Sequence, residues 1–189
     1  MEEVPVRKEL SEQEARLLLA VRQGKHGQVQ SLIHNQGGNP FFLIECKRNL
    51  LHVAVMEAKI LNLNIINLII GLFVNTDINP NLQVFSVDAQ DFVGNTPLHM
   101  LASKHVCKEH RDYVILEKIL DALKNAGANF NAKTKQGKTP LDYACKSCGK
   151  TMLLFVSKHP DLTKAERFNL SAVAVQLLGK NCSKKFIKY

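Results

Sequence analysis

Short apolar blocks recur along the chain, each rich in Leu, Val or Ala and bounded by polar residues. They lie at residues 17–21, 50–54, 98–102 and 141–144. Blocks of this kind predict short helices with a small apolar face, against which a second helix can pack closely. A longer apolar stretch, residues 60–74, is interrupted by asparagines and predicts a buried core helix. At about 15 residues it is shorter than the roughly 20 that a membrane span needs.

The residues around these blocks repeat one motif. Residues 94–102 read GNTPLHMLA, residues 137–144 read GKTPLDYA, and residues 49–54 are a weaker copy, NLLHVA. Thr before Pro predicts a helix start, because the hydroxyl caps a free backbone N–H and Pro at the first helical position loses no hydrogen bond. The Gly two residues earlier suits a tight turn, and Gly127 is placed to end the preceding helix. The chain is therefore predicted to be an array of similar units.

This pattern resembles the ankyrin repeat, whose unit runs from a turn through a Thr-Pro-Leu-His helix start and two helices to a Gly-Ala-Asp-x-Asn-Ala end. The likeness is closest over residues 91–144, looser over 49–74 and faint over 12–35, and it extends to residue 159. It implies an all-α, ankyrin-type helix–turn–helix solenoid of about four units. In that family the motif histidine bridges neighbouring turns by hydrogen bonds.

The intervals between units depart from the family period of about 33 residues. Equivalent positions in the four units are Ala15, Asn49, Thr96 and Thr139. The first interval is normal, whereas the next two are roughly 14 and 10 residues too long. The excess is expected in the long helix of the second unit with a loop at 75–82, and in a segment at 104–111. Such insertions usually lie in loops on one face, so they are candidate partner contacts or simple variations in loop length.

A C-terminal helix is expected to close the array. Asp161 or Thr163 can cap its start, and apolar residues then follow at near-helical spacing. These are Phe168, Ala172, Val175 and Leu178. The helix would cover the open end of the repeats, or alternatively dock a partner. The expected divisions are an N-terminal tail (1–10), the ankyrin-repeat array (11–160), the capping helix (161–179) and a basic tail (180–189).

Composition agrees with a small solenoid. Of the 189 residues, 46% are hydrophobic and only 6% aromatic, which suits thin helical layers. No Gly/Ser linker or low-complexity stretch indicates a second domain. The acidic residues 2–3 and the short first apolar block give no sign of a secretory signal. Five Cys without such a signal indicate free thiols in a reducing compartment. We therefore expect a cytoplasmic monomer with no transmembrane segment.

The net charge of +8 is concentrated toward the C-terminal end. Residues 130–159 contain six Lys and one acid, Asp142, and residues 180–189 contain four Lys and no acid. Such an end attracts an acidic peptide, anionic lipid or nucleic acid, unless the lysines only solvate the last unit. Few aromatic residues stand among these lysines, which disfavours base stacking on nucleic acid. We therefore expect a protein partner with an acidic segment.

Motifs for catalysis are absent from the sequence. Gly-Lys-Thr occurs at residues 137–139 and 149–151, but the earlier Gly of a phosphate-binding loop is Ala in both cases. Neither Gly-x-Ser-x-Gly nor His-Glu-x-x-His is present. His52 and His99 belong to the repeat motif, so the family resemblance assigns them a structural role. We expect no enzyme activity and no cofactor.

A cluster of Cys and His offers the alternative of a zinc-binding or redox-sensitive protein. A tetrahedral zinc site would use Cys107, His110, Cys145 and Cys148, from a CxxH and a CxxC in consecutive units. Against zinc, Cys145 stands where the family carries a small Ala, and Cys148 stands at a turn Gly position. A redox CxxC would need a strand–helix–strand setting that the pattern does not predict. The preferred prediction is no metal.

The resemblance implies a protein–protein interaction scaffold that binds through exposed turns and the groove face of each first helix. Apolar Phe92 and Val93 at a turn tip are the best hot-spot candidates. The candidate partner-binding residues are Glu45, Cys46, Arg48, Met56, Glu57, Phe92, Val93, Asn95, Ser103, Lys104, Lys135, Gln136, Lys138, Lys146 and Ser147.

Two biological settings fit such a module. One is a cytosolic regulator that inhibits a transcription factor or signalling enzyme. The other is a pathogen effector or viral protein acting on targets in the host cytoplasm or nucleus. The irregular unit spacing favours the second by analogy.

Overall fold

A computed structural model describes residues 9–56, 62–74, 85–104, 110–147, 149–164, 166–167 and 170. This part of the chain is helical and contains no β-strand. Its α-helices are α1 (Glu12–Arg22), α2 (His26–His34), α3 (Leu50–Met56), α4 (Leu63–Val74), α5 (Pro97–Ala102), α6 (His110–Asn125), α7 (Pro140–Ser147) and α8 (Gly149–Lys158). A short 3-10 helix, η1 (Glu45–Lys47), precedes α3.

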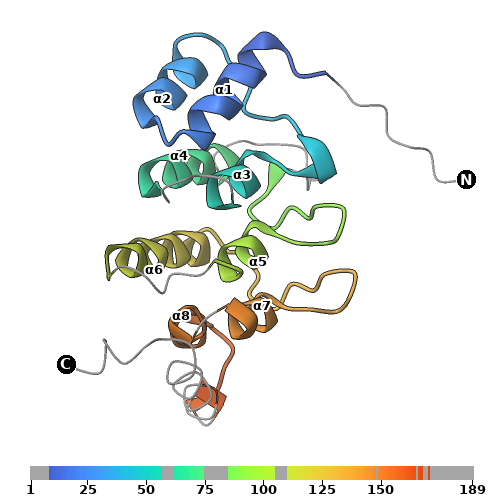
Figure 1. Cartoon of the computed structure of the whole chain (residues 1–189), viewed down its shortest axis with the longest axis vertical. Coiled ribbons are helices and arrows are strands. Elements are labelled where there is room, and N and C mark those ends of the chain that lie inside the picture. Colours follow the sequence, from blue (N-terminus) through green and yellow to red (C-terminus); the bar gives the residue numbers. More distant parts are fainter. Residues whose placement is uncertain are drawn as a thin grey trace, which may run out of the picture.

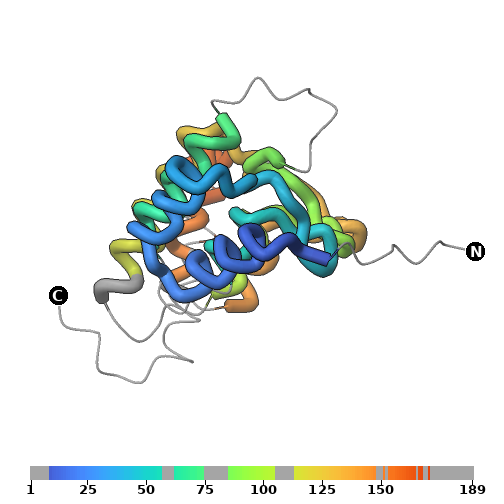
Figure 2. Tube along the Cα trace, turned by 90° about the horizontal axis from the view of Figure 1, so that it is seen from above, coloured from blue at the N-terminus to red at the C-terminus, as the bar shows by residue number. Residues whose placement is uncertain are grey.

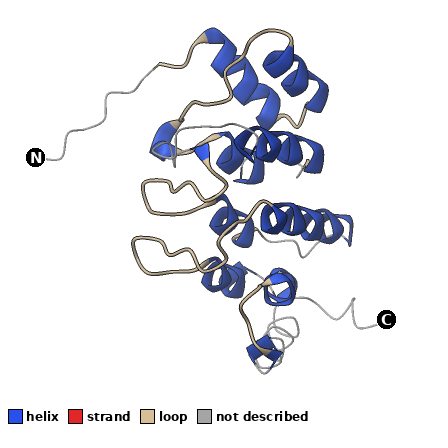
Figure 3. Cartoon of the chain, turned by 180° about the vertical axis from the view of Figure 1, so that it is seen from behind, coloured by secondary structure: helices blue, strands red, loops and turns tan. Residues whose placement is uncertain are grey.

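The helices form four stacked pairs (Figure 1). The inner helices pack in the order α1, α3, α5 and α7, and the outer helices follow in the order α2, α4, α6 and α8. Seen along the stack, the pairs lie over one another (Figure 2). The loops before α5 and α7 project from the same side, next to the inner helices (Figure 3). The expected all-α, ankyrin-type solenoid is confirmed.

The repeated motif starts helices as predicted, through side chains that reach back to the cap. In α5 the Thr96 N–H donates to His99 Nδ1 at 3.2 Å, and Pro97 is the first helical residue. In α7 the Thr139 N–H donates to Asp142 Oδ2 at 2.8 Å. Each pair satisfies backbone donors that a helix start would otherwise leave free. An acid therefore performs in the last unit the capping that histidine performs in the one before it.

The first unit begins earlier than its alignment at residue 15 indicates. Ser11 caps α1, accepting from the Glu14 N–H at 3.3 Å while the Ser11 N–H donates to Glu14 Oε2 at 2.8 Å. This reciprocal pair is a capping box, and it extends α1 by one turn. The register of the core is unaffected, because Leu17 is fully buried like its counterparts Leu51 and Leu98.

The glycines of the motif occupy left-handed backbone conformations, as expected. Gly94 and Gly137 have φ of +89° and +72°. Gly127, at +82°, ends α6: its N–H donates to Lys124 O, and the next N–H donates to Leu123 O, both at 3.0 Å. This is a Schellman motif, which satisfies the last carbonyls of the helix.

A helix start after the array also follows the expectation. Thr163 is its cap, with the Thr163 N–H donating to Glu166 Oε2 at 2.8 Å. The Arg167 guanidinium donates to the carbonyls of Val156 and Ser157 at the end of α8, at 2.9 and 2.6 Å. These bonds tie the start of the proposed capping segment to the last repeat.

Several sequence predictions fall outside the described residues. They include the tail at 1–8, most of the insertions at 75–82 and 104–111, the residues Phe168, Ala172, Val175 and Leu178, and the basic tail. The apolar helix of the second unit is described from Leu63 onward. Within the described ranges, no helix combines the length and the apolar character needed to cross a membrane.

Candidate functional site

Three short loops with the same backbone closure project beside the inner helices, and we call them fingers. Finger 1 is residues 44–48, finger 2 is 91–95 and finger 3 is 134–138. In each, the first N–H donates to the fifth carbonyl at 2.9 Å. Gly94 and Gly137 occupy the fourth position of fingers 2 and 3, whereas finger 1 places Lys47 there at φ +57°. The same closed loop therefore occurs in all three fingers, with Gly at its fourth position in fingers 2 and 3.

The fingers are joined to one another through their backbones. The Phe92 N–H of finger 2 donates to Cys46 O of finger 1 at 2.9 Å, and the Lys135 N–H of finger 3 donates to Val93 O at 3.0 Å. The approach is close: a Cβ on Gly94 would lie 2.7 Å from Lys135 N. Lys47 Nζ lies 5.2 Å from the centroid of the Phe92 ring, within cation–π range. The fingers therefore form a continuous row.

A buried acid holds finger 2 in shape. The Asp91 side chain is fully buried and accepts from the N–H groups of Val93 and Asn95 at 2.9 and 2.8 Å. Arg48 Nε approaches Asp91 Oδ2 at 3.6 Å from finger 1. The Asn95 side chain donates to the same carboxylate and accepts from the Tyr143 hydroxyl at 2.7 Å. Arg48 and Asn95, expected as partner contacts, are thus engaged in supporting the fingers.

The motif histidines connect the fingers to the inner helices. His52 Nε2 lies 3.1 Å from Asn95 O, and His99 Nε2 lies 3.0 Å from Lys138 O. Because a carbonyl oxygen can only accept a hydrogen bond, each Nε2 carries a proton and donates to the carbonyl that it faces. Burial lowers the pKa of His52 to about 4 and also lowers the pKa of His99. Both rings are therefore neutral bridges, as the family resemblance implied.

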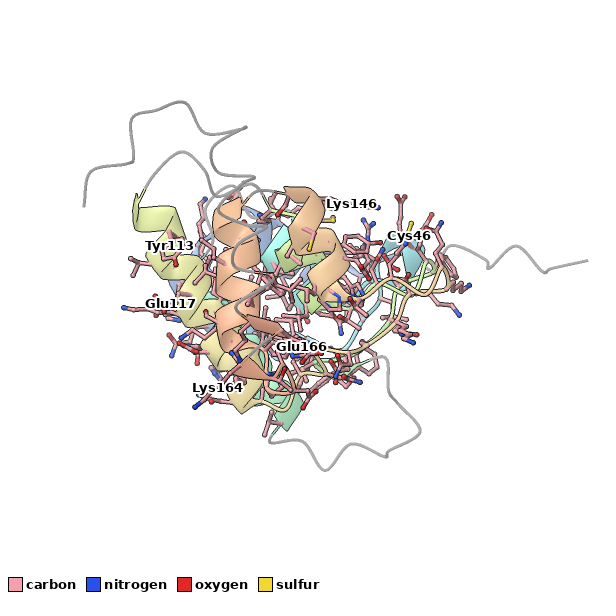
Figure 4. All side chains as sticks on the ribbon, turned by 90° about the horizontal axis from the view of Figure 1, so that it is seen from below. Cys46, Tyr113, Glu117, Lys146, Lys164 and Glu166 are labelled. Carbon is pink, nitrogen blue, oxygen red and sulfur yellow. The ribbon has the colours of Figure 1, made fainter. Side chains whose placement is uncertain are left out.

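The fingers expose seven of the fifteen expected partner-binding residues. Phe92 and Val93 are 38% and 46% exposed, so two adjacent large apolar side chains stand together at the tip of finger 2. The other expected residues that are exposed on the fingers are Glu45, Cys46, Lys135, Gln136 and Lys138. Figure 4 places Cys46 on the side of the molecule opposite Tyr113 and Glu117 of α6. Fingers and outer helices therefore present opposite faces.

The remaining expected residues divide between the groove and the core. Ser103 and Lys146 are exposed at the ends of α5 and α7, whereas Ser147 is 8% exposed. Met56 packs partly buried against the core. Lys104 is half-buried, and this burial lowers its pKa. Glu57 lies outside the described residues.

An open hollow lies where finger 3 meets the ends of α5 and α7. Its volume is about 310 Å³. It is lined by Ser103, Gln136, Lys138, Tyr143, Lys146 and Ser147. Five of these six were expected from the sequence. Tyr143 was missed, although a hydroxyl-bearing ring in the inner-helix position that holds Val53 and Met100 in earlier units was a usable signal.

The proposed cysteine cluster finds little support in the described residues. Among them, no group of three or more His, Cys, Asp or Glu side chains is placed to hold a metal ion. Cys145 lies inside α7 rather than after it, and burial raises the pKa of its thiol, which disfavours the thiolate that zinc requires. Cys107 and Cys148 lie outside the description, as does the side chain of His110.

A family model, that of the ankyrin repeat, matches residues 93–135. The matched segment runs from the tip of finger 2 through α5 and α6 to the first residues of finger 3. The units on either side repeat its capped inner helix, and α7 is again preceded by a finger of the same closure. Motif, helix pairing and stacking therefore agree with an array of ankyrin-type repeats, and residues 93–135 match the model of that family.

Proposed function

We propose that this chain is a non-enzymatic protein-recognition module, which binds a protein partner along the fingers and the groove face of the inner helices and thereby modulates it. The ankyrin fold supports protein–protein interaction as the general role. The observation that carries the specific surface is the exposure of Phe92 and Val93 at the tip of finger 2. Neither belongs to the hydrophobic core or packs against it. A partner that covers these side chains gains apolar contact area without repacking the module.

Rigidity of the fingers favours this use. A backbone bond from each finger to the one before it, and the buried Asp91 beneath finger 2, hold the tips in place before a partner arrives. Preorganised loops lose little conformational entropy on binding, so more of the contact energy remains as affinity. The inserted segments at 75–82 and 104–111 are also proposed as partner contacts, because insertions in repeat arrays usually lie in loops on one face.

The charge distribution supports a partner with an acidic segment. Lys135, Lys138 and Lys146 are exposed on finger 3 and α7, whereas Glu45 is exposed on finger 1. We place the acidic part of the partner toward the last repeat, where complementary charges speed association.

The biological setting is a proposal by analogy with the family. The unequal unit intervals favour a pathogen effector or viral protein that acts on host targets over a resident regulator. We place its action in the cytoplasm, or in the host cytoplasm or nucleus for an effector, and we propose that it acts as a monomer.

The test is affinity capture with a finger variant and a control variant. Phe92→Ala with Val93→Ala truncates two exposed apolar side chains on finger 2. Val74→Ala truncates another apolar side chain, 59% exposed, at the end of the outer helix α4. Proteins held by the native chain should be lost from the finger variant and kept by the control, with melting temperatures nearly unchanged. Equal retention by both variants would contradict the proposed surface.

A further inference from the structure

The hollow beside finger 3 is lined by side chains of defined chemistry. The role inferred for it rests on the proposed function and makes the chemistry of the partner more specific. Finger 3 contributes Gln136 and Lys138, and α7 contributes Tyr143, Lys146 and Ser147, while Ser103 ends α5. Two successive units therefore build one site. Its volume of about 310 Å³ lies at the lower end of the range for small-ligand pockets, which is room enough to admit an inserted side chain.

The hydroxyl groups of the hollow already donate to the chain itself. Ser103 Oγ donates to Met100 O at 2.8 Å, and Ser147 Oγ donates to Ala144 O at 2.9 Å. The Tyr143 hydroxyl donates to Asn95 Oδ1 at 2.7 Å. A hydroxyl has one proton to donate, so none of these three is available as a donor to a ligand.

The donors left to a ligand are cationic or amide groups. Lys138 and Lys146 are exposed, and within the described part of the chain no hydrogen bond is donated by either ammonium group. The Gln136 side-chain amide stands beside them as a neutral donor. Two ammonium groups and an amide around one small hollow select an anion as the ligand.

Asp142, on the same helix as Tyr143 and Lys146, is already committed to the helix start. Asp142 Oδ2 accepts from the Thr139 N–H and hydroxyl at 2.8 and 2.9 Å. These bonds lower the pKa of Asp142, with smaller contributions from the charges of Lys138 and Lys146. Asp142 therefore stays ionised and moderates the repulsion between the two lysines. The Asp142 side chain keeps its capping bonds to Thr139 at the same time.

We propose that this hollow anchors the carboxylate of one Asp or Glu side chain from an acidic segment of a protein partner. Lys138 and Lys146 hold the carboxylate from two elements, the Gln136 amide donates a neutral hydrogen bond, and the Tyr143 ring contacts the side-chain methylenes. No Arg lines the hollow. Arg clusters are the usual means of recognising phosphorylated peptides, so the donor set favours a carboxylate over a phosphate group.

The experiment uses the full chain and a short peptide of alternating Glu and Gly, followed by backbone amide shifts in NMR, which detect even millimolar binding. Shifts are expected at Gln136, Lys138, Tyr143 and Lys146. Lys138→Gln and Lys146→Gln should each weaken binding by about two- to five-fold, in line with exposed ion pairs. Lys133→Gln is the matched control, because it removes one exposed charge just before finger 3 without lining the hollow. It should change binding by less than about 1.5-fold at physiological salt, where screening acts within roughly 8 Å.

Three results would overturn the proposal. Equal weakening by Lys133→Gln would assign the binding to a diffuse basic surface. Equal affinity for a peptide of alternating Gln and Gly would show that the hollow does not recognise a carboxylate. Tighter binding of inorganic phosphate, with shifts at the same backbone amides, would show that it is a phosphate site instead. Failure here is distinguishable from failure of the proposed function, because the capture experiment with the Phe92 and Val93 variant does not involve these lysines.

Discussion

Replacing Gly94 with Ala tests whether the fingers form a packed row. Gly94 has φ +89°, and an added Cβ would meet backbone atoms of finger 3, with Lys135 N at 2.7 Å. The left-handed backbone should cost about 1–2 kcal/mol for Ala. Loss of the bond from the Lys135 N–H to Val93 O should cost about 1 kcal/mol more. We therefore expect Gly94→Ala to destabilise the chain by roughly 2–3 kcal/mol.

Gly137 provides an internal control for that substitution. It occupies the same position in finger 3 with φ +72°, but nothing lies within 4 Å of an added Cβ. Gly137→Ala should therefore carry only the backbone strain, about 1 kcal/mol, partly offset by a less flexible unfolded chain. Urea unfolding followed by far-ultraviolet circular dichroism measures the free energy of unfolding of both variants. The slope of that free energy against urea concentration should be unchanged. If the two variants differed by less than about 0.5 kcal/mol, the close packing of fingers 2 and 3 would be refuted.

Three further predictions concern the core, pH and charge. Leu98→Ala should destabilise by about 2–5 kcal/mol through a cavity, and Leu141→Ala by less because its side chain is partly exposed. A neutral Leu98→Ala in urea unfolding would contradict the unit alignment. The pKa of His52 is about 4 in the folded state, below its ordinary 6.5, so its contribution to stability is present above pH 6.5. That contribution is lost as pH falls from 6.5 toward 4, by at most about 3 kcal/mol, and unfolding of His52→Gln should show a flatter pH profile. Replacing Lys135 and Lys138 with Glu should slow association with a captured acidic partner more than it speeds dissociation. If stopped-flow association rates changed neither with this charge reversal nor with salt, these lysines would not be part of the interface.

Most of the repeat architecture could be predicted from the sequence because it depends on local chemistry. A Thr-Pro pair, a following His or Asp and a Gly with positive φ act within a few residues, so the motif around Thr96 revealed a helix start and a turn. The same logic was available at Ser11 and Glu14, whose capping-box spacing predicts the early start of α1. Aligning that unit on Ala15 overlooked this signal.

Features that depend on contact between units could not be predicted in the same way. The bond from the Phe92 N–H to Cys46 O, and the contact of Arg48 with Asp91, join residues far apart in the sequence. Arg48 and Asn95 look like surface residues of a turn until the buried carboxylate beside them is known. The hydrogen bond from the Tyr143 hydroxyl to Asn95 of the preceding unit is a contact of the same kind.

Hydrogen–deuterium exchange of the full chain, with and without a captured partner, tests the central claim most directly. The claim is that the partner lies on the fingers and the inner helices. Protection is predicted at residues 91–95 and 134–138 and at the end of α7, with little change in α6 and α8. Protection confined to the outer helices α6 and α8, with the fingers unchanged, would contradict it.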